Sequence, residues 1–281
     1  MAARLTEMTN RHVIAWAGFS LVVPVEWNLS VAHGDTDSGT IALTDLHMGQ
    51  LEVRWRSGRP RGLARQLRRL VGKMRRLKAT VSAVAGRESA WKIDDGRRWI
   101  VLMHISRRLY EISGPGGAPA EAEIPDSFTD TQNAELYRWR VYGIDAAVPA
   151  KWKLKKISLL PGASRLEFQP RWFSPPGLRA GSWSMADRLL AGDSLETWAS
   201  AKLPLVARYP SGRWESMGKG VVFRAAAGRW RQRKAQALAL WQNRENNCIV
   251  WLHTSLPQRR SALTDRLVKA FLEEVTSGGG Q

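Results

Sequence analysis

Apolar and polar residues alternate in several short segments of the chain, as they do in β-strands that bury one face. The first such segment has Phe19, Leu21 and Val23 at alternate positions and stops at Pro24, because proline cannot donate to a strand ladder. Comparable patterns cover residues 40–43, 50–55, 97–104, 107–112, 230–241 and 248–254. Turn-forming residues separate these segments, so the pattern predicts antiparallel hairpins.

Two segments instead have apolar residues three or four positions apart, which predicts amphipathic helices at 61–78 and 261–275, and start and stop signals predict a helix between them that runs through Leu203 to a stop at Pro204. The middle helix opens with a capping box, in which Asp193 is the N-cap and Glu196 follows three residues later. The last helix has four large apolar residues on one face, namely Leu263, Leu267, Phe271 and Val275. Strands and helices mixed in this way indicate the α+β class.

A short motif occurs twice and indicates an internal duplication. Residues 18–29 align with residues 143–154 when one position is skipped, and both copies contain Pro-x-x-Trp-x-Leu. A Leu-Glu-apolar triplet follows each copy, beginning at Leu51 in the first and at Leu166 in the second. The longer loop at 34–39 is expected to absorb the difference in spacing. A period of this length predicts duplicated domains, and chance similarity between two edge strands is the alternative.

The order of elements resembles the PsbP-like α/β/α sandwich: a strand, Pro-x-x-Trp, a meander, an Asp-Ser-Leu-Glu-x-Trp helix, a long hairpin and a C-terminal helix. The second half of the chain matches more fully, and residues 124–128 stand where the first half would have its terminal helix. The resemblance implies two tandem α/β/α sandwich domains, 1–130 and 131–281, each a mainly antiparallel sheet with flanking helices. It also implies an accessory, non-catalytic role, and it implies no particular ligand.

The chain is strongly basic, which favours negatively charged partners. Its 281 residues include 43 Lys and Arg against 25 Asp and Glu, a formal net charge of +18, while 44% of the residues are apolar. The apolar content argues against disorder, and the basic excess occurs in both halves of the sequence. No run of 18 apolar residues exists, and the apolar run at 13–25 reappears mid-chain, so we expect neither a transmembrane helix nor a signal peptide, and a cytoplasmic protein.

The helix at 61–78 concentrates this charge. No acidic residue lies between Val53 and Arg87, and on a helical wheel the apolar side chains Leu63, Leu67 and Leu77 share one face, with Leu70, Val71 and Met74. The opposite arc holds seven basic residues: Arg61, Arg65, Arg68, Arg69, Lys73, Arg75 and Arg76. Like charges four residues apart destabilise a helix, so we predict that these seven bind an anionic partner. An ordinary solvated face is the alternative.

A second basic segment alternates like a strand and contains Arg229, Arg231, Arg233 and Lys234. With Trp230 on its other face it is either a basic ribbon of the kind that binds single-stranded nucleic acid or a hairpin arm with solvated arginines, and we favour the hairpin arm. It is included as a secondary basic patch.

Motifs for catalysis are absent from the sequence. There is no phosphate-binding loop or dinucleotide fingerprint, and the five histidines form no i,i+4 pair and have no neighbouring cysteine. The single cysteine, Cys248, lies in an apolar run and predicts a buried, unreactive thiol. We therefore predict no metal, no cofactor and no enzymatic activity.

The prediction for function is a binding or assembly protein that docks through a basic surface onto an acidic protein partner or larger complex. A nucleic-acid-binding protein that uses the arginine-rich helix, and an enzyme with an unrecognised site, are the alternatives.

Overall fold

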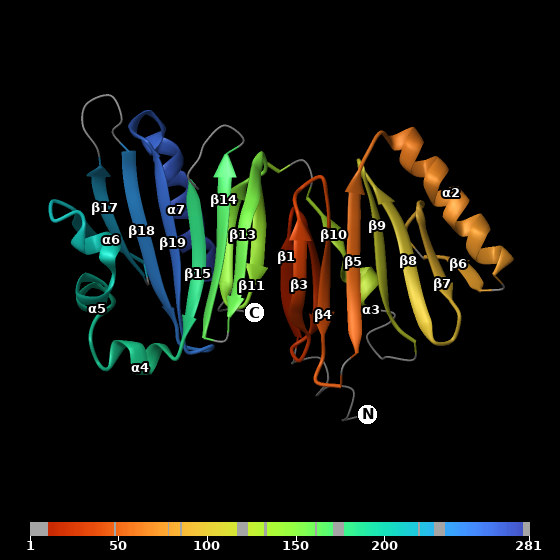
Figure 1. Cartoon of the computed structure of the whole chain (residues 1–281), viewed down its shortest axis with the longest axis horizontal. Coiled ribbons are helices and arrows are strands. Elements are labelled where there is room, and N and C mark those ends of the chain that lie inside the picture. The colour runs from red at the N-terminus through yellow and green to blue at the C-terminus, as the bar shows by residue number, and fades with distance from the viewer. Residues whose placement is uncertain are drawn as a thin grey trace. The chain divides into compact units, whose positions relative to one another are not determined.

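The structure is a computed structural model that describes residues 11–277 except 48, 78, 85, 117–122, 132–133, 161, 171–176, 219 and 228–233. It is an α+β structure of mainly antiparallel sheets with few helices, as the sequence predicted (Figure 1). The chain divides into two compact units, Met1–Tyr137 and Arg138–Gln281. None of the described helices combines the length and the apolar character needed to cross a bilayer.

The first unit is built on a seven-stranded antiparallel sheet in the order β3-β4-β5-β9-β8-β7-β6. Its strands are β3 (Asn28–Gly34), β4 (Ser38–Thr44), β5 (Gln50–Ser57), β6 (Thr80–Ala83), β7 (Ala90–Asp94), β8 (Arg98–Ile105) and β9 (Arg108–Pro115). Three further strands pair in the order β10-β2-β1, namely β1 (Arg11–Trp16), β2 (Phe19–Pro24) and β10 (Thr129–Asp130). The strands predicted in this half are confirmed.

Each face of this sheet is covered by a different layer. Helix α2 (Pro60–Arg76) packs over β6 to β9 on one face. On the other face Phe19 of β2 meets Trp55 and Tyr110, with ring centroids 5.2 and 5.7 Å apart. Phe128, just after helix α3 (Glu123–Ser127), completes this aromatic core at 4.7 Å from Tyr110. The segment predicted at 124–128 therefore forms most of a short helix that ends at Ser127 and is followed by the buried Phe128, which helps to close the core.

The second unit has a seven-stranded antiparallel sheet in the order β13-β14-β15-β19-β18-β17-β16. Its strands are β13 (Trp152–Leu160), β14 (Ala163–Pro170), β15 (Leu178–Ser184), β16 (Arg213–Met217), β17 (Gly220–Ala227), β18 (Lys234–Asn243) and β19 (Cys248–Pro257). Two shorter strands precede them, β11 (Leu136–Val141) and β12 (Ile144–Pro149). The strand predicted at 248–254 is confirmed, and the one predicted at 230–241 is described from Lys234 onward.

Helices lie on both faces of this second sheet. Three short ones, α4 (Ala186–Leu190), α5 (Leu195–Lys202) and α6 (Pro204–Ala207), pack with Trp198 over Leu238 and Trp251. Helix α7 (Ser261–Ser277) follows the 3-10 turn η4 (Gln258–Arg260) and contacts β12, β18 and β19. The buried stripe of α7 is Thr264, Leu267, Val268, Phe271 and Leu272. It is rotated from the predicted face, because Leu263 is only partly buried; the Val275 side chain lies outside the description.

The start of α5 corrects the predicted capping box by one residue. Ser194 is the N-cap, because its Oγ accepts a hydrogen bond from the Thr197 amide at 3.2 Å. The Asp193 amide instead donates to the Leu190 carbonyl at 2.8 Å, which keeps Asp193 in the turn that ends α4.

The two seven-stranded sheets have the same topology, since the strand order of the second equals that of the first with ten added to each number. The tryptophan of a Pro-x-x-Trp segment immediately precedes β3 and is the first residue of β13. Both strands contain a register shift two residues after it, at Leu29 and at Leu154. Leu29 pairs with Leu43 and Leu154 with Phe168, so the two hairpins have equal length. This corrects the sequence alignment of the triplets, because Leu51 is in β5 whereas Leu166 is in β14. The two copies therefore do not differ in hairpin spacing, and the loop at 34–39 has no such difference to absorb.

Candidate functional site

Helix α2 is held against the sheet by its apolar stripe. Leu63, Leu67 and Val71 are 4–7% exposed and pack with Ile93, Leu102 and Leu109, flanked by Leu70 and Met74. The wheel placed Leu77 on the same stripe, but Leu77 is the C-cap and is 65% exposed, because the helix ends one residue earlier. The apolar face of α2 therefore packs against the sheet from Leu63 to Met74, and Leu77 takes no part in this contact.

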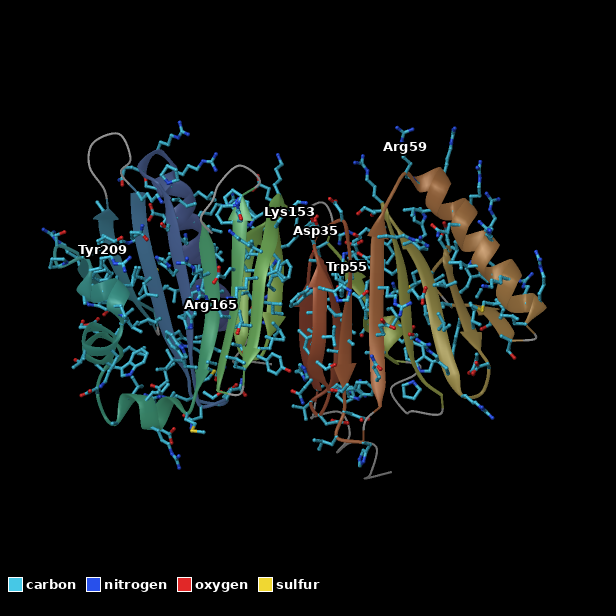
Figure 2. All side chains as sticks on the ribbon, in the orientation of Figure 1. Asp35, Trp55, Arg59, Lys153, Arg165 and Tyr209 are labelled. Atoms are coloured by element: carbon cyan, nitrogen blue, oxygen red, sulfur yellow. The ribbon has the colours of Figure 1, made fainter. Side chains whose placement is uncertain are left out.

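The outer face of α2 carries all seven predicted basic residues, and all seven are exposed. Figure 2 shows nitrogen-tipped side chains projecting outward from this helix. Within the described part of the chain, none of the seven has an ion pair or a hydrogen bond through its side chain; the one ring contact places the Arg75 guanidinium 5.8 Å from the Trp91 ring centroid. We call these seven residues the α2 basic face.

Several arginines on the strands of both units, by contrast, have acidic partners. Arg54 pairs with Glu52 at 2.9 Å. In the second unit, Arg138 pairs with Asp145 at 2.7 Å. The difference arises because the sequence around α2 has no acidic residue to offer, and the first turn of the helix has none either. The positive charges of the α2 basic face are therefore not neutralised by acidic side chains among the described residues.

The geometry of the α2 basic face suits an extended anionic surface. Residues four apart on a helix are separated by about 6 Å along the axis, so Arg61, Arg65, Arg69 and Lys73 form one row. The 17 residues of α2 extend over roughly 25 Å. Six of the seven residues are arginines, which bind carboxylate or phosphate oxygens in pairs.

The secondary basic patch is only partly described. Arg229, Arg231 and Arg233 lie outside the described residues, as does Trp230. Lys234 opens β18, where it pairs with Pro257 and is partly buried. The two interpretations of this segment therefore both stay open.

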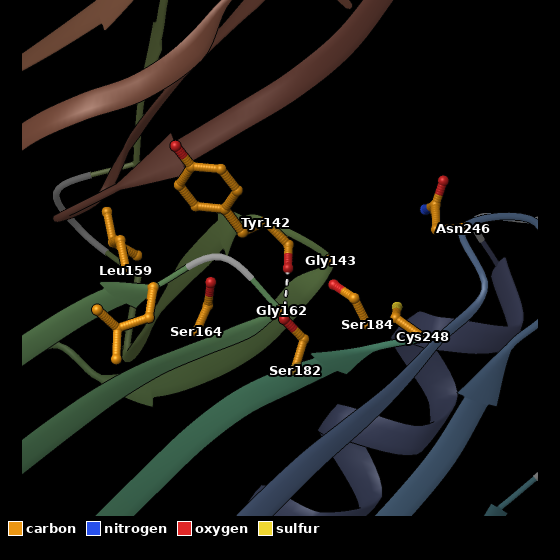
Figure 3. Close-up of a pocket in the computed structure, with 10 residues that line it drawn as sticks. Tyr142, Gly143, Leu159, Gly162, Ser164, Ser182, Ser184, Asn246 and Cys248 are labelled. Carbon is orange, nitrogen blue, oxygen red and sulfur yellow. Dashed lines mark hydrogen bonds between the residues drawn. The ribbon is translucent and has the colours of Figure 1, made fainter. Parts of the chain in front are cut away.

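A pocket of about 410 Å³ lies in the second unit between the start of β12, the β13–β14 turn and β19 (Figure 3). Ser182 donates a hydrogen bond from its Oγ to the Tyr142 carbonyl at 2.6 Å. Cys248 lines the pocket but is 4% exposed, and burial raises the pKa of its thiol, as expected for an unreactive cysteine. None of the described lining residues is acidic, basic or a histidine, so these residues supply no carboxylate or imidazole for acid–base chemistry. Its residues come from separate segments, and no sequence motif indicated it.

Metal ligation finds no support in the described part of the chain, which contains no group of three or more His, Cys, Asp or Glu side chains able to hold an ion. In the acidic loop at 34–39, the Asp35 carboxylate accepts hydrogen bonds from the amides of Asp37 and Ser38. That carboxylate therefore stabilises its own turn.

No protein-family model matches the chain, and no curated protein matches it. Among solved structures, a chain from "The crystal structure of Tle4-Tli4 complex" aligns over 89% of this chain and 87% of its own length. The alignment has a TM-score of 0.31 and 12% sequence identity. Similarity at this level establishes neither a shared fold nor a shared activity.

Proposed function

We propose that the protein is a non-catalytic binding or assembly protein that docks through the α2 basic face onto an acidic partner protein or larger complex. The observation that carries the proposal is that seven exposed cations on one helix have no acidic partner within the described residues. Crowding them together costs a few tenths of a kcal/mol for each like-charged i,i+4 pair. An acidic surface that neutralises them on binding removes this cost.

The scaffold proposed for this function is a tandem pair of PsbP-like α/β/α sandwiches, corresponding to the domains 1–130 and 131–281. It is supported by the identical strand orders, by the equal hairpin lengths and by Trp27 and Trp152, each 5% exposed at equivalent positions. Only the first copy has the single long basic helix between its third and fourth sheet strands. The copies would thus share a fold while one carries the docking helix, and the proposed location of the protein is the cytoplasm.

The test is charge reversal on the helix. We expect the R65E/R68E/R69E variant to lose its partner when tagged protein is purified from its own cells, whereas R188E/R208E/R213E, with the same change in net charge at exposed sites of the second unit, keeps it. Equal recovery of the partner by both variants would overturn the proposal.

Nuclease treatment separates the second candidate, a nucleic-acid-binding protein, which the arginine content of α2 also favours. An association with a protein partner is expected to persist after nuclease treatment. An association with nucleic acid is expected to be abolished by nuclease, and the logarithm of its binding constant should fall linearly with the logarithm of the salt concentration. An unrecognised enzymatic site stays the third candidate.

A further inference from the structure

The second unit has a polar sheet face that its helices leave open. Helices α4, α5 and α6 pack over β17, β18 and β19, where Phe223, Leu238 and Trp251 are buried. Farther along the same face, Lys156 of β13 and Arg165 of β14 are exposed. Arg165 is labelled in Figure 2; its register row continues through Gly181 to Trp251, which packs with the layer of α4 to α6.

The strand registers arrange this face in two rows. Lys156 pairs with Glu167, Glu167 with Arg179, and Arg179 with His253, so one row crosses β13, β14, β15 and β19. The next row in the same direction is Ser158, Arg165, Gly181 and Trp251. Side chains of directly paired residues lie on the same face, and residues two apart in a strand do so as well. We call these two rows the β13–β15 face.

The charges of the β13–β15 face do not balance. Glu167 is its one acidic residue; it is buried, as is His253, and forms an ion pair with the exposed Arg165. Arg179, next to Glu167 in the register, has no ion pair or hydrogen bond through its side chain with any described residue, and its Nε is buried without a partner. His253 contributes no charge near neutral pH, because its pKa is lowered to about 4. Burial is the largest cause of this shift, and the positive charges of Arg179 and Arg165 add to it. Its Nε2 is hydrogen-bonded to Gln236 at 2.9 Å.

The equivalent row of the first unit shows that the sheet itself does not require this excess. Matching the registers places Val31, Ala42, Glu52 and Ser113 where the second unit has Lys156, Glu167, Arg179 and His253. At the position of Arg179 the first unit thus has Glu52, which pairs with Arg54 at 2.9 Å and with Arg98 at 3.8 Å. In the first unit this position is neutralised internally, whereas in the second unit the Arg179 guanidinium has no partner among the described residues.

We propose that the β13–β15 face binds carboxylate side chains of an acidic protein segment, with Arg179 as the principal contact and Lys156 at its margin. The guanidinium of Arg179 matches a carboxylate in shape and charge, and its buried Nε leaves the terminal nitrogens as the donors. Glu167 lies within the same row, so a continuous phosphate backbone would pass over a carboxylate, whereas isolated Asp or Glu side chains avoid it. The face belongs to the second unit and does not depend on the α2 basic face.

The experiment measures fluorescence polarisation of a labelled decapeptide with alternating Glu and Thr, titrated with the full-length chain. We expect R179Q to weaken binding at least about tenfold, because a charge-assisted hydrogen bond is lost. K156Q, a substitution at an exposed site with no role in folding, is expected to weaken it by about two- to threefold. E167Q is expected to strengthen it, since it removes the competing carboxylate and releases Arg165. The matched control is R259Q, which removes an equal charge from the exposed η4 turn.

The same titrations with a Gln/Thr peptide and with an oligothymidylate of equal charge distinguish the occupants. We expect no binding of the neutral peptide, and oligothymidylate binding that is the same for R179Q and R259Q. Equal affinity of R179Q and R259Q for the acidic peptide overturns the inference, as does the absence of peptide binding or an Arg179-dependent preference for the oligonucleotide. In the R65E/R68E/R69E background, R179Q is expected to weaken peptide binding by the same factor as in the parent chain, because the two faces act independently. Failure of the α2 proposal would therefore leave this result unchanged.

Discussion

Arg108 is almost fully buried in the first unit and joins three elements that are distant in sequence. Its Nη1 donates to the Ala17 carbonyl in the β1–β2 turn at 2.7 Å and to the Tyr110 hydroxyl at 3.2 Å. Tyr110 in turn donates to Asp130 of β10 at 2.8 Å, and the carboxylate of Asp130 lies 4.0 Å from Arg108. Burial is the main cause that raises the pKa of Tyr110, so this phenol is protonated at neutral pH and donates to Asp130.

Replacing either member of the buried pair leaves an uncompensated charge. We expect R108M and D130N each to lower the free energy of unfolding of the first unit by about 3 kcal/mol or more. The double variant is expected to lose less than the sum, because both charges are then gone. Urea denaturation followed by fluorescence measures this, with R97M at an exposed turn as the control. Additive losses would show that the pair is not coupled.

Because His253 is buried in the second unit, we expect the stability of that unit to depend on pH. Its folded pKa is about 4, against 6.5 for the unfolded chain, so between these values the unfolded state binds more protons. Stability should therefore rise with pH from 4 to 6.5, by up to about 3 kcal/mol from this residue. H253Q should flatten the curve in that window. Parallel curves for H253Q and the parent would contradict the assignment.

At the scale of elements, Gly72 lies in the middle of α2, which continues through it without interruption. A Cβ at this position would meet no atom within 4 Å, so the structure provides no close approach that requires glycine. We expect G72A to stabilise the first unit by about 0.5–1 kcal/mol through helix propensity, as measured by thermal and urea unfolding. The control is G181A, because a Cβ at that position would lie 2.4 Å from the Trp251 ring. This variant is expected to destabilise the second unit.

Local patterns predicted elements well where one residue period decides the structure. The 3.6-residue period of Leu63, Leu67 and Val71 located α2, and alternation located β8 and β9. The error at Asp193 arose because two adjacent residues, Asp193 and Ser194, both suit an N-cap. The triplets at Leu51 and Leu166 were aligned wrongly because Leu-Glu-apolar fits any half-buried strand. Position in a sheet depends on pairing between distant segments, which a local pattern does not contain.

The same limit applies to the candidate sites. The α2 basic face was predictable, because its seven cations share one helix and their spacing alone places them together. The β13–β15 face was not, since Lys156, Glu167, Arg179 and His253 are brought into one row only by three strand registers. Burial of Arg108 likewise follows from its pairing with Asp130 and has no sequence motif.

For the whole molecule, a net charge of +18 predicts that added salt stabilises the fold. Like charges repel one another in the compact state, and salt screens this repulsion within about 10 Å at 0.1 M. We expect the melting temperature to rise by about 2–4 °C between 0.05 and 0.5 M sodium chloride. A protein stabilised mainly by surface ion pairs would show the opposite trend.

The variant R65E/R68E/R69E connects this prediction to function. It lowers the formal net charge from +18 to +12 and makes the repulsive i,i+4 pairs 61/65 and 69/73 attractive, while the pair 65/69 stays like-charged. We therefore expect it to melt at a higher temperature than the parent chain in low salt and to respond less to added salt, in differential scanning calorimetry. The same substitutions should abolish partner binding, so stability and binding would change in opposite directions. A lower melting temperature in low salt would mean that these arginines stabilise the fold, and the argument for a docking face would lose its basis.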